Sequence, residues 1–467
     1  MPSIWWVPWP SGDGVNHAAT PSTLKAATAS AAQTTRSPRV AETGTGAVGA
    51  AMAAPTRTPS DALRSADGRL GGKEDGSTDI VIAMVAQRTF LRMTFADSTG
   101  PIHHTPSAAS ANATAAAHTP VHAPWWLDAH LDLAYLHLGG PTVTEELPDP
   151  VTRGVSLPAL ARGEVRIFLG TIFTEVGTEA ASTPWGYRDH DDIEGAHAAG
   201  VRQLEMYEWL EHTGRARIVR SAADLDECAA APAGSPPGIV ILMEGADPVR
   251  SPDEFAWWHT RGVRVVGLTW AKGSRYAGGN AAQGPLTDIG RRAVEAMDAL
   301  GILLDASHLC DEAFAGVCAA TSSRIVATHS NVRALAAPVE RHLTDAQIAE
   351  IAARGGMVGL NLYGKFLAAG RAATLADAVA HVQHVASIAG RNCVGLGSDF
   401  DGGFTPADCA TGCGRPEELP ALTAGLAQAG FNHAEQAAFA HGNWLRTLRA
   451  SLHDAERGAV SRMSLGR

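Results

Sequence analysis

The sequence of 467 residues lacks the long apolar runs and the excess of positive charge that mark membrane-spanning and nucleic-acid-binding proteins. No apolar run reaches the roughly 18 residues that a transmembrane helix needs. The formal net charge is −11 at pH 7, which argues against nucleic acid or an anionic membrane surface as the main partner. The start also lacks a basic segment followed by an apolar one, so no convincing signal peptide is found and a cytoplasmic location is expected.

Cysteine is scarce, and six residues in a chain of this length are too few for a disulfide scaffold. Cys310, Cys318 and Cys393 lie in or beside predicted strands and helices, so we expect them to be reduced residues of the core. Cys409 and Cys413 fall in a predicted loop. A disulfide or a shared metal is one interpretation of this pair, but an isolated C-x-x-x-C lacks the usual zinc spacing, which favours no role.

The first 120 residues lack sustained hydrophobic periodicity. Ala, Thr, Ser, Pro and Gly dominate them, and such a composition cannot bury enough apolar surface to offset the entropy lost on ordering. We therefore expect residues 1–120 to be a disordered, low-complexity tail. The alternative is a mis-assigned start, with the true one at Met84 or Met93. The adjacent His103 and His104 are attributed to a solvated tail rather than to a metal site.

Residues 121–467 contain what the tail lacks, namely eight apolar runs of strand length that are mostly separated by helical patterns. The runs are Trp126 to Leu133, Val165 to Phe173, Ile239 to Glu244, Val263 to Trp270, Ile302 to His308, Arg324 to His329, Met357 to Tyr363 and Val394 to Phe400. Strands that alternate with helices indicate a parallel sheet. Eight such units predict an α/β protein, a (β/α)8 TIM-like barrel with insertions. The longest insertion is Thr174 to Pro237, with a helix expected near Ile193 to Thr213.

Four further helices are predicted from periodicity and from their start and stop signals. Amphipathic patterns cover Asp288 to Leu300 and Thr374 to Ala389, and a last helical pattern, His433 to Leu452, closes the chain. Thr344 followed by Gln347 is a capping signature, and it begins a helix that Gly355-Gly356 ends.

Acids and histidines stand where the predicted strands end. The six positions are His130, Asp132, Glu244, His308, His329 and Asp399. His130 and Asp132 are two residues apart on one strand, so their side chains share a face, which in a barrel is the interior. Since barrel enzymes place active-site residues at the C-terminal ends of their strands, we expect the six side chains to meet at one barrel mouth.

These six side chains together predict a metal site. A single histidine at a strand end is explained as well by a structural role, but the whole set would repel itself or stay unsatisfied without a cation. Imidazole and carboxylate ligands without thiolate suit zinc, with manganese, cobalt or iron as alternatives. Five ligands exceed the need of one tetrahedral zinc, so two ions that share Glu244 as a bridging carboxylate would use them all.

The motifs around these residues closely resemble, in the same order, those of the membrane (renal) dipeptidase family of zinc peptidases. They are His130-x-Asp132, Met243-Glu244-Gly245, Ser307-His308, Thr328-His329-Ser330-Asn331, Arg354 to Asn361, Gly397 to Gly402 and His441 to Arg446. The similarity covers residues 127 to 452. It implies a binuclear zinc dipeptidase on a TIM-like barrel, with a small dipeptide as substrate and a homodimer as the assembly.

The resemblance also implies a role for each residue of the site. The ligands of the two zinc ions are then His130 with Asp132 and His308 with His329, bridged by Glu244. Asp399 matches the family's acid/base carboxylate. Arg341 matches the arginine that holds the substrate carboxylate, with a spacing from His329 that is one residue longer than the family's.

One position departs from the family pattern. The family's fourth strand often ends in Leu-Thr-His, and the resemblance implies that this histidine polarises the scissile carbonyl. Here the run ends in Leu268-Thr269-Trp270. Tryptophan offers an N–H donor but cannot carry charge, and we interpret Trp270 as a wall of the substrate pocket. Asp401, the second carboxylate near Asp399, is expected to cap the following turn.

These features favour a dipeptidase that hydrolyses the amide bond through a metal-bridging hydroxide. Two cations lower the pKa of a bridging water toward roughly 7. Asp399 then accepts the proton and passes it to the leaving amine. Trp270 and the insertion leave open a related hydrolase of N-acyl amino acids, lactones or cyclic amides. A non-catalytic metal-binding sensor is disfavoured, because it has no need of a proton shuttle.

Overall fold

The computed structural model describes residues 124–453, apart from 141, 148–152 and 337–338. The predictions for the tail of residues 1–120, including its two adjacent histidines, lie outside the described residues. Among the described helices, none combines the length and apolar character needed to cross a bilayer. All six cysteines fall within the described part, and all of them are free, Cys409 and Cys413 included.

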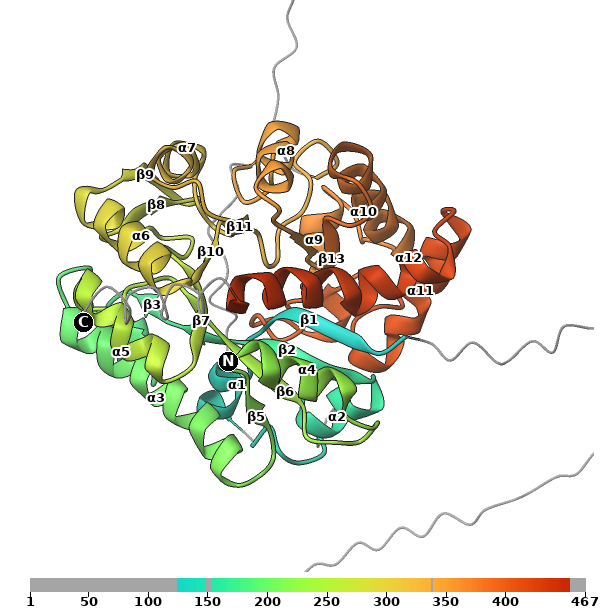
Figure 1. Ribbon diagram of the computed structural model, residues 1–467, viewed down its shortest axis with the longest axis horizontal. Coiled ribbons are helices and arrows are strands. Elements are labelled where there is room, and N and C mark those ends of the chain that lie inside the picture. Colours follow the sequence, from blue (N-terminus) through green and yellow to red (C-terminus); the bar gives the residue numbers. More distant parts are fainter. Residues whose placement is uncertain (1–123, 141, 148–152, 337–338, 454–467) are drawn as a thin grey trace, which may run out of the picture. The chain divides into compact units, whose positions relative to one another are not determined.

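Eight parallel strands form the central sheet in the order β11-β10-β7-β6-β2-β1-β13-β12 (Figure 1). They are β1 (Trp126–Leu131), β2 (Val165–Phe173), β6 (Gly238–Glu244), β7 (Val263–Gly267), β10 (Leu303–Asp305), β11 (Ile325–Val326), β12 (Val358–Leu360) and β13 (Val394–Leu396). The two ends of this order meet just beyond β11, where Ala327 forms a parallel bridge with Val358. Each predicted run overlaps one strand, so the (β/α)8 barrel is confirmed.

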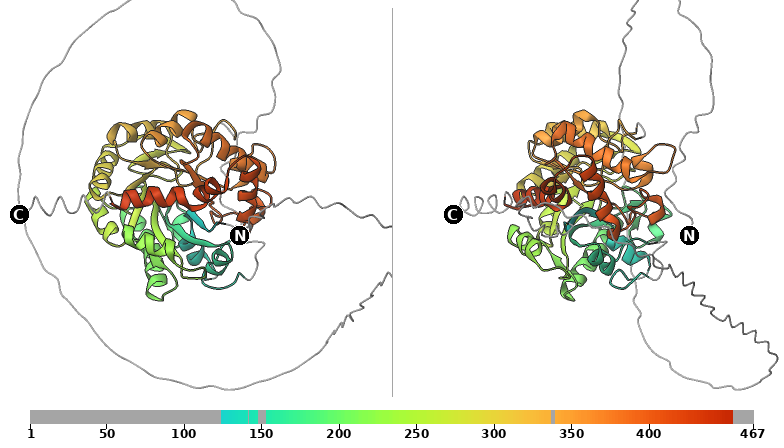
Figure 2. Two further views of the ribbon diagram at one scale, coloured as in Figure 1. Left: turned by 45° about the vertical axis from the view of Figure 1, so that its right-hand side comes forward. Right: turned by 90° about the vertical axis from the view of Figure 1, so that its right-hand side faces the viewer.

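Helices surround the strands on the outside (Figures 1 and 2). They are α1 (Leu133–Gly139), α2 (Leu157–Arg162), α3 (Ile193–His212), α4 (Ala222–Ala230), α5 (Phe255–Thr260), α6 (Asp288–Leu300), α7 (Asp311–Ala320), α8 (Asp345–Ala353), α9 (Gly364–Leu367), α10 (Leu375–Ala389), α11 (Leu419–Gln428) and α12 (His433–Ala437). The predicted capping box is present at α8, where Thr344 and Gln347 bond each other's backbone. The predicted last helix is not uniform, because a π-helical turn (Ala438–Gly442) separates α12 from a helix over 443–453.

The long insertion after β2 adds short elements to the helices α3 and α4. They are β3 (Glu175–Val176), which pairs with β4 (Gly186–Tyr187), and β5 (Arg217–Ile218), which pairs with β6. A further hairpin, β8 (Ala277–Gly279) and β9 (Ala282–Leu286), follows β7. These additions extend the loops around the barrel without interrupting its closed order of strands.

The two faces of the strands belong to two separate apolar clusters. On β6, Ile239, Ile241 and Met243 pack in the cluster shared with the surrounding helices. Val240 and Leu242 pack in a second cluster, which joins strands from all around the barrel and includes Trp444 of the last helix. Side chains alternate along a strand, so Glu244 follows Val240 and Leu242 into the barrel interior.

The strands end earlier than the predicted runs at the C-terminal side. The run to His308 leaves strand geometry after Asp305, and the run to Phe400 leaves it after Leu396. His308 and Asp399 have φ angles of 68° and 58°, in the left-handed region that non-glycine residues seldom adopt. Such turns take the chain out of the sheet, which places these side chains at the rim of the barrel.

Candidate metal centre and active site

The six predicted residues converge at the C-terminal mouth of the barrel. Each is at most 8% exposed: His130, Asp132, Glu244, His308, His329 and Asp399. Two overlapping groups have potential ligand atoms within 4.8 Å of one another, namely His130 with Glu244 and His329, and His130 with Asp132 and Asp399. The structure therefore brings together residues that lie up to 269 positions apart in the sequence.

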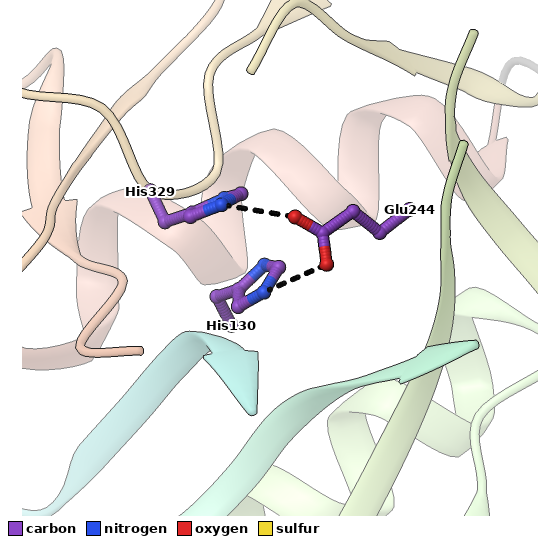
Figure 3. Close-up of side chains that lie close together, drawn as sticks. All are labelled: His130, Glu244 and His329. Atoms are coloured by element: carbon purple, nitrogen blue, oxygen red, sulfur yellow. Dashed lines mark ion pairs between the residues drawn. The ribbon is translucent and has the colours of Figure 1, made fainter. Parts of the chain in front are cut away.

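Glu244 lies at the centre of this cluster, and its two oxygens face different imidazoles (Figure 3). Its Oε2 is 3.5 Å from His130 Nε2. Its Oε1 is 2.9 Å from His308 Nε2 and 3.2 Å from His329 Nε2. Asp132 lies on the His130 side, with its Oδ1 3.8 Å from His130 Nε2. The two oxygens of one carboxylate thus face a histidine–aspartate pair and a histidine–histidine pair.

Neighbouring polar groups orient two of the imidazoles. His308 Nδ1 pairs with Asn280 Oδ1 at 2.9 Å, and His329 Nδ1 pairs with Thr328 Oγ1 at 2.9 Å. Thr328 donates its hydroxyl proton to Asp305 Oδ2 (2.6 Å), so its oxygen accepts the proton of His329 Nδ1. The lone pair of His329 is then on Nε2, which faces Glu244. Such outer partners are typical of histidines that bind metals.

His130 provides a test of whether the residues fit a cation. Its ring is buried against that of His329, with the ring centroids 3.6 Å apart. Within the described part of the chain, neither ring nitrogen makes a well-aligned hydrogen bond. A buried polar atom left in this way costs about 1–3 kcal/mol. An imidazole nitrogen aimed at carboxylates, with no protein hydrogen bond of its own, fits a metal ligand.

The electrostatics of the cluster favour ligand-competent protonation states at two of the histidines. Burial lowers the pKa of His308 to about 4, and burial together with the neighbouring His130 lowers that of His329. For Glu244, burial acts to raise the pKa, but the positive charge of His130 and hydrogen bonds from His308 and His329 outweigh it and lower the pKa well below the usual range. Burial acts to lower the pKa of His130, but Glu244 and Asp132 outweigh it and raise that pKa well above 6.5. His308 and His329 are thus neutral and Glu244 is ionised, as metal binding requires.

Asp399 follows β13 and is held among the same groups. Its backbone N–H donates to His130 O (3.2 Å), and its Oδ2 accepts a hydrogen bond from Asn361 Nδ2 (2.8 Å). The preceding Ser398 donates to the buried Asp128 from its N–H (2.8 Å) and its hydroxyl (2.5 Å). Burial raises the pKa of Asp399 to about 7, with the negative charges of the nearby carboxylates adding to the effect.

Arg341 reaches the cluster from the loop after β11. It is buried, and its Nη2 donates to the carbonyl oxygen of His329 (2.7 Å) while Nη1 donates to Ser330 Oγ (3.0 Å). Its guanidinium also lies over the ring of Phe366, 5.0 Å from the centroid. The structure thus places Arg341 beside the histidine pair, although its spacing from His329 is one residue longer than the family's.

Trp270 lies on the β7 side of the cluster. Its ring centroid is 6.1 Å from that of His308 and 5.2 Å from that of Phe173. Lys272 Nζ lies 5.6 Å from the Trp270 ring centroid and pairs with Glu175 of the insertion at 2.8 Å. This partly buried indole therefore borders the metal-binding histidine candidates, which agrees with its interpretation as a wall.

The expectation that Asp401 caps the following turn is wrong. Backbone carbonyls accept the N–H groups of that turn, because Gly402 N bonds Asp399 O (3.2 Å) and Gly403 N bonds Asp401 O (2.8 Å). The side chain of Asp401 is instead buried near Asp132. Burial and the charge of Asp132 raise the pKa of Asp401 well above its usual value.

Three polar residues of this site were given no role from the sequence. Asp128 precedes His130 on β1, Asn361 follows β12, and Asn280 comes from the β8–β9 hairpin. Asp128 carried a usable signal, because it is a carboxylate in an otherwise apolar strand two residues before a candidate ligand. Asn280 and Asn361 lie in segments whose place beside the site depends on tertiary structure alone.

A closed (β/α)8 barrel with a buried histidine–carboxylate cluster at its C-terminal mouth is typical of metal-dependent enzymes. The family is then established by sequence. The model of the membrane dipeptidase family (peptidase family M19) matches residues 115–459, so the chain belongs to this family.

Known relatives agree with this assignment. An uncharacterized Klebsiella pneumoniae protein from the pqqA 5′ region is 33% identical over 275 residues, which cover 56% of this chain and 97% of that protein. Dipeptidase aclJ of Aspergillus oryzae is 32% identical over 151 residues, covering 31% of this chain and 36% of its own. A Rhodobacter sphaeroides metallopeptidase, solved with a phosphinate mimic of the dipeptide L-Ala-D-Ala, has a TM-score of 0.61 and 27% identity, covering 70% of this chain and 99% of that one.

The predicted family and enzyme class are thereby confirmed. The protein is a metallo-dipeptidase, a hydrolase that acts on small-molecule substrates containing a peptide bond. The family implies a metal, and the cluster around Glu244 is a set of side chains that fits one.

Proposed function

We propose that this metallo-dipeptidase works with two zinc ions that Glu244 bridges. The observation that carries the proposal is the position of Glu244, whose two oxygens face His130 on one side and His308 with His329 on the other. His130 and Asp132 would hold the first ion, and His308 and His329 the second. The absence of thiolates from this set favours zinc, and manganese, cobalt or iron suit the same donors.

When bound, such cations polarise the scissile carbonyl and lower the pKa of water toward roughly 7. The residues of the chain supply the proton transfer. Asp399 has a carboxylate oxygen within 4.8 Å of the potential ligand atoms of His130 and Asp132, which puts it in reach of a water at the cluster. It accepts a proton from that water and later protonates the leaving amine.

Arg341 binds the free carboxylate of the dipeptide in this proposal. Its guanidinium is buried beside the histidine pair, and within the described residues its Nε has no hydrogen-bond partner. A charge-assisted pair with a carboxylate would satisfy it. Trp270 lies three residues past the end of β7, with its ring centroid 6.1 Å from that of His308, where it would contact the other end of the substrate.

Trp270 also supports a second candidate function. A tryptophan cannot carry the charge of the histidine that the family often has at this position. A related hydrolase that acts on N-acyl amino acids, lactones or cyclic amides is therefore the alternative. The test is the turnover of dipeptides and of N-acyl amino acids by the zinc-loaded protein. Hydrolysis of N-acyl amino acids without dipeptides would replace the first proposal by the second. A homodimer and a cytoplasmic location remain predictions.

A further inference from the structure

Asn361 bonds Asp399 with an amide whose orientation is determined by its surroundings. The side chain is wholly buried, one residue past the end of β12. Its Oδ1 accepts the backbone N–H of Tyr363 (2.7 Å), and its Nδ2 donates to Asp399 Oδ2 (2.8 Å). A flipped amide would place two donors face to face at Tyr363 and two acceptors face to face at Asp399. Asn361 is therefore an obligatory donor to Asp399.

The backbone of Asn361 is itself held by a second buried asparagine. Asn361 N donates to Asn331 Oδ1 (3.1 Å), and Asn331 Nδ2 donates back to Asn361 O (2.9 Å) and to Phe366 O (3.1 Å). Asn331 comes two residues after His329, in the segment that follows β11. Asparagine side chains thus connect the segments that follow three adjacent strands, from Asn331 through Asn361 to Asp399.

The other oxygen of Asp399 is restricted by close packing. A Cβ at position 402 would overlap Asp399 Oδ1, so the carboxylate lies directly against the Cα of Gly402. Asp399 also has a φ of 58°, a backbone conformation that needs support from its surroundings. With Gly402 against one oxygen and Asn361 bonded to the other, the carboxylate has little freedom to rotate.

We propose that Asn361 is the positioning residue of Asp399, which it holds in the orientation needed for proton transfer. The proposal rests on the catalytic role proposed above for Asp399. A neutral amide suits this task, because it donates a hydrogen bond without adding charge beside Glu244 and Asp132. Reaction geometry is demanding, and a displacement of about 1 Å can cost roughly 100-fold in rate.

The substitution Asn361→Asp tests this role. Aspartate has nearly the same shape and can still accept the Tyr363 N–H, but it presents an oxygen instead of a donor to Asp399. We expect metal content to stay at the wild-type level and KM to change by less than about threefold. We expect kcat to fall by about 10–100-fold because the carboxylate is displaced. A purely structural role for Asn361 would leave kcat unchanged.

Asn443→Asp is the matched control. Asn443 is equally buried, and its Nδ2 donates to Val394 O (2.9 Å) at the opposite end of β13 and to Arg391 O (2.8 Å). Arg446 Nη1 donates to its Oδ1 (2.9 Å), which would help to accommodate the new charge. This variant should lower the melting temperature while kcat stays at the wild-type value.

A double-mutant cycle with Asp399→Asn separates the inference from the proposed function. Once Asp399 cannot take a proton, Asn361→Asp should cause no further loss of kcat, whereas independent effects would add. If Asp399→Asn is inactive and Asn361→Asp keeps kcat within about twofold, the positioning role is overturned alone. If Asp399→Asn is fully active, both proposals fail. Should Asn361→Asp not fold, Asn361→Ala removes the donor without adding charge, and the same outcomes apply.

Discussion

The two ends of the barrel present opposite kinds of side chain to the interior, although the same strands form both. Where the strands begin, the interior holds a purely apolar cluster: Leu127, Leu169, Val240, Val265, Leu303, Val326, Met357 and Trp444. Where they end, it holds imidazoles, carboxylates and the polar groups that bond them. Along β6 the change takes two residues, from Leu242 to Glu244. Burying so many ionisable groups costs free energy. The burial of apolar side chains at the other end therefore has to offset this cost.

Substitution of Asp399 should give the largest effect confined to the charged end. We expect Asp399→Asn to keep the wild-type metal content and to lose kcat by about 10²–10⁴-fold or more, because asparagine still accepts a hydrogen bond but takes no proton. Elemental analysis and steady-state kinetics on the same preparation measure the two quantities. Full activity would move the proton shuttle to another group, with Asp401 the next candidate. A lost metal would make Asp399 a ligand.

Substitution of Trp444 should affect the apolar end alone. Trp444 is wholly buried in the interior cluster, and its Nε1 donates to Leu396 O (2.9 Å). We expect Trp444→Ala to lower the free energy of unfolding by about 3–5 kcal/mol. The fraction that remains folded should keep its kcat. Urea unfolding and active-site-normalised kinetics check this, and a stable variant with low kcat would mean that the two ends are not separable.

His342, next to Arg341, should make the charged end sensitive to acid. Burial lowers its pKa from 6.5 to about 3. Below pH 6.5, His342 binds a proton in the unfolded chain but not in the folded protein. The free energy of unfolding therefore falls from pH 6.5 toward pH 3. Between pH 7.5 and 5 this costs about 2 kcal/mol. His342→Gln, which does not titrate, should lose that much less on acidification in urea unfolding. Equal losses in both proteins would refute the assignment.

Substitution of Trp270 should have a smaller effect, and we expect it on substrate preference rather than on the chemical step. If its ring contacts the first residue of the dipeptide, Trp270→Ala should reduce the preference for leucine over glycine at that position by about tenfold. The ratio of kcat/KM for the two dipeptides is the measurement. An unchanged ratio would remove Trp270 from the substrate pocket and leave it as part of the fold.

The sequence predicted the strands well, because buried parallel strands are nearly continuous apolar runs. It predicted the rim less well. Six of the eight runs were extended past the C-terminal ends of their strands. Nothing in residue type shows where a strand gives way to a turn, as where His308 and Asp399 take left-handed φ angles. The hydrogen-bond partners of the site residues were harder still to predict from the sequence. Asn361 and Asp399 are 38 positions apart, and their bond depends on how β12 and β13 align.

The most direct test of the two-metal account is the number of zinc ions per chain in the wild type and in Glu244→Gln. The account predicts close to two in the wild type. It predicts clearly fewer in Glu244→Gln, with affinity reduced beyond the roughly 10–100-fold that loss of an outer partner costs. Elemental analysis after equilibrium dialysis against buffered zinc gives both numbers. One ion or none in the wild type, or two ions held equally well by Glu244→Gln, would contradict a site bridged by Glu244.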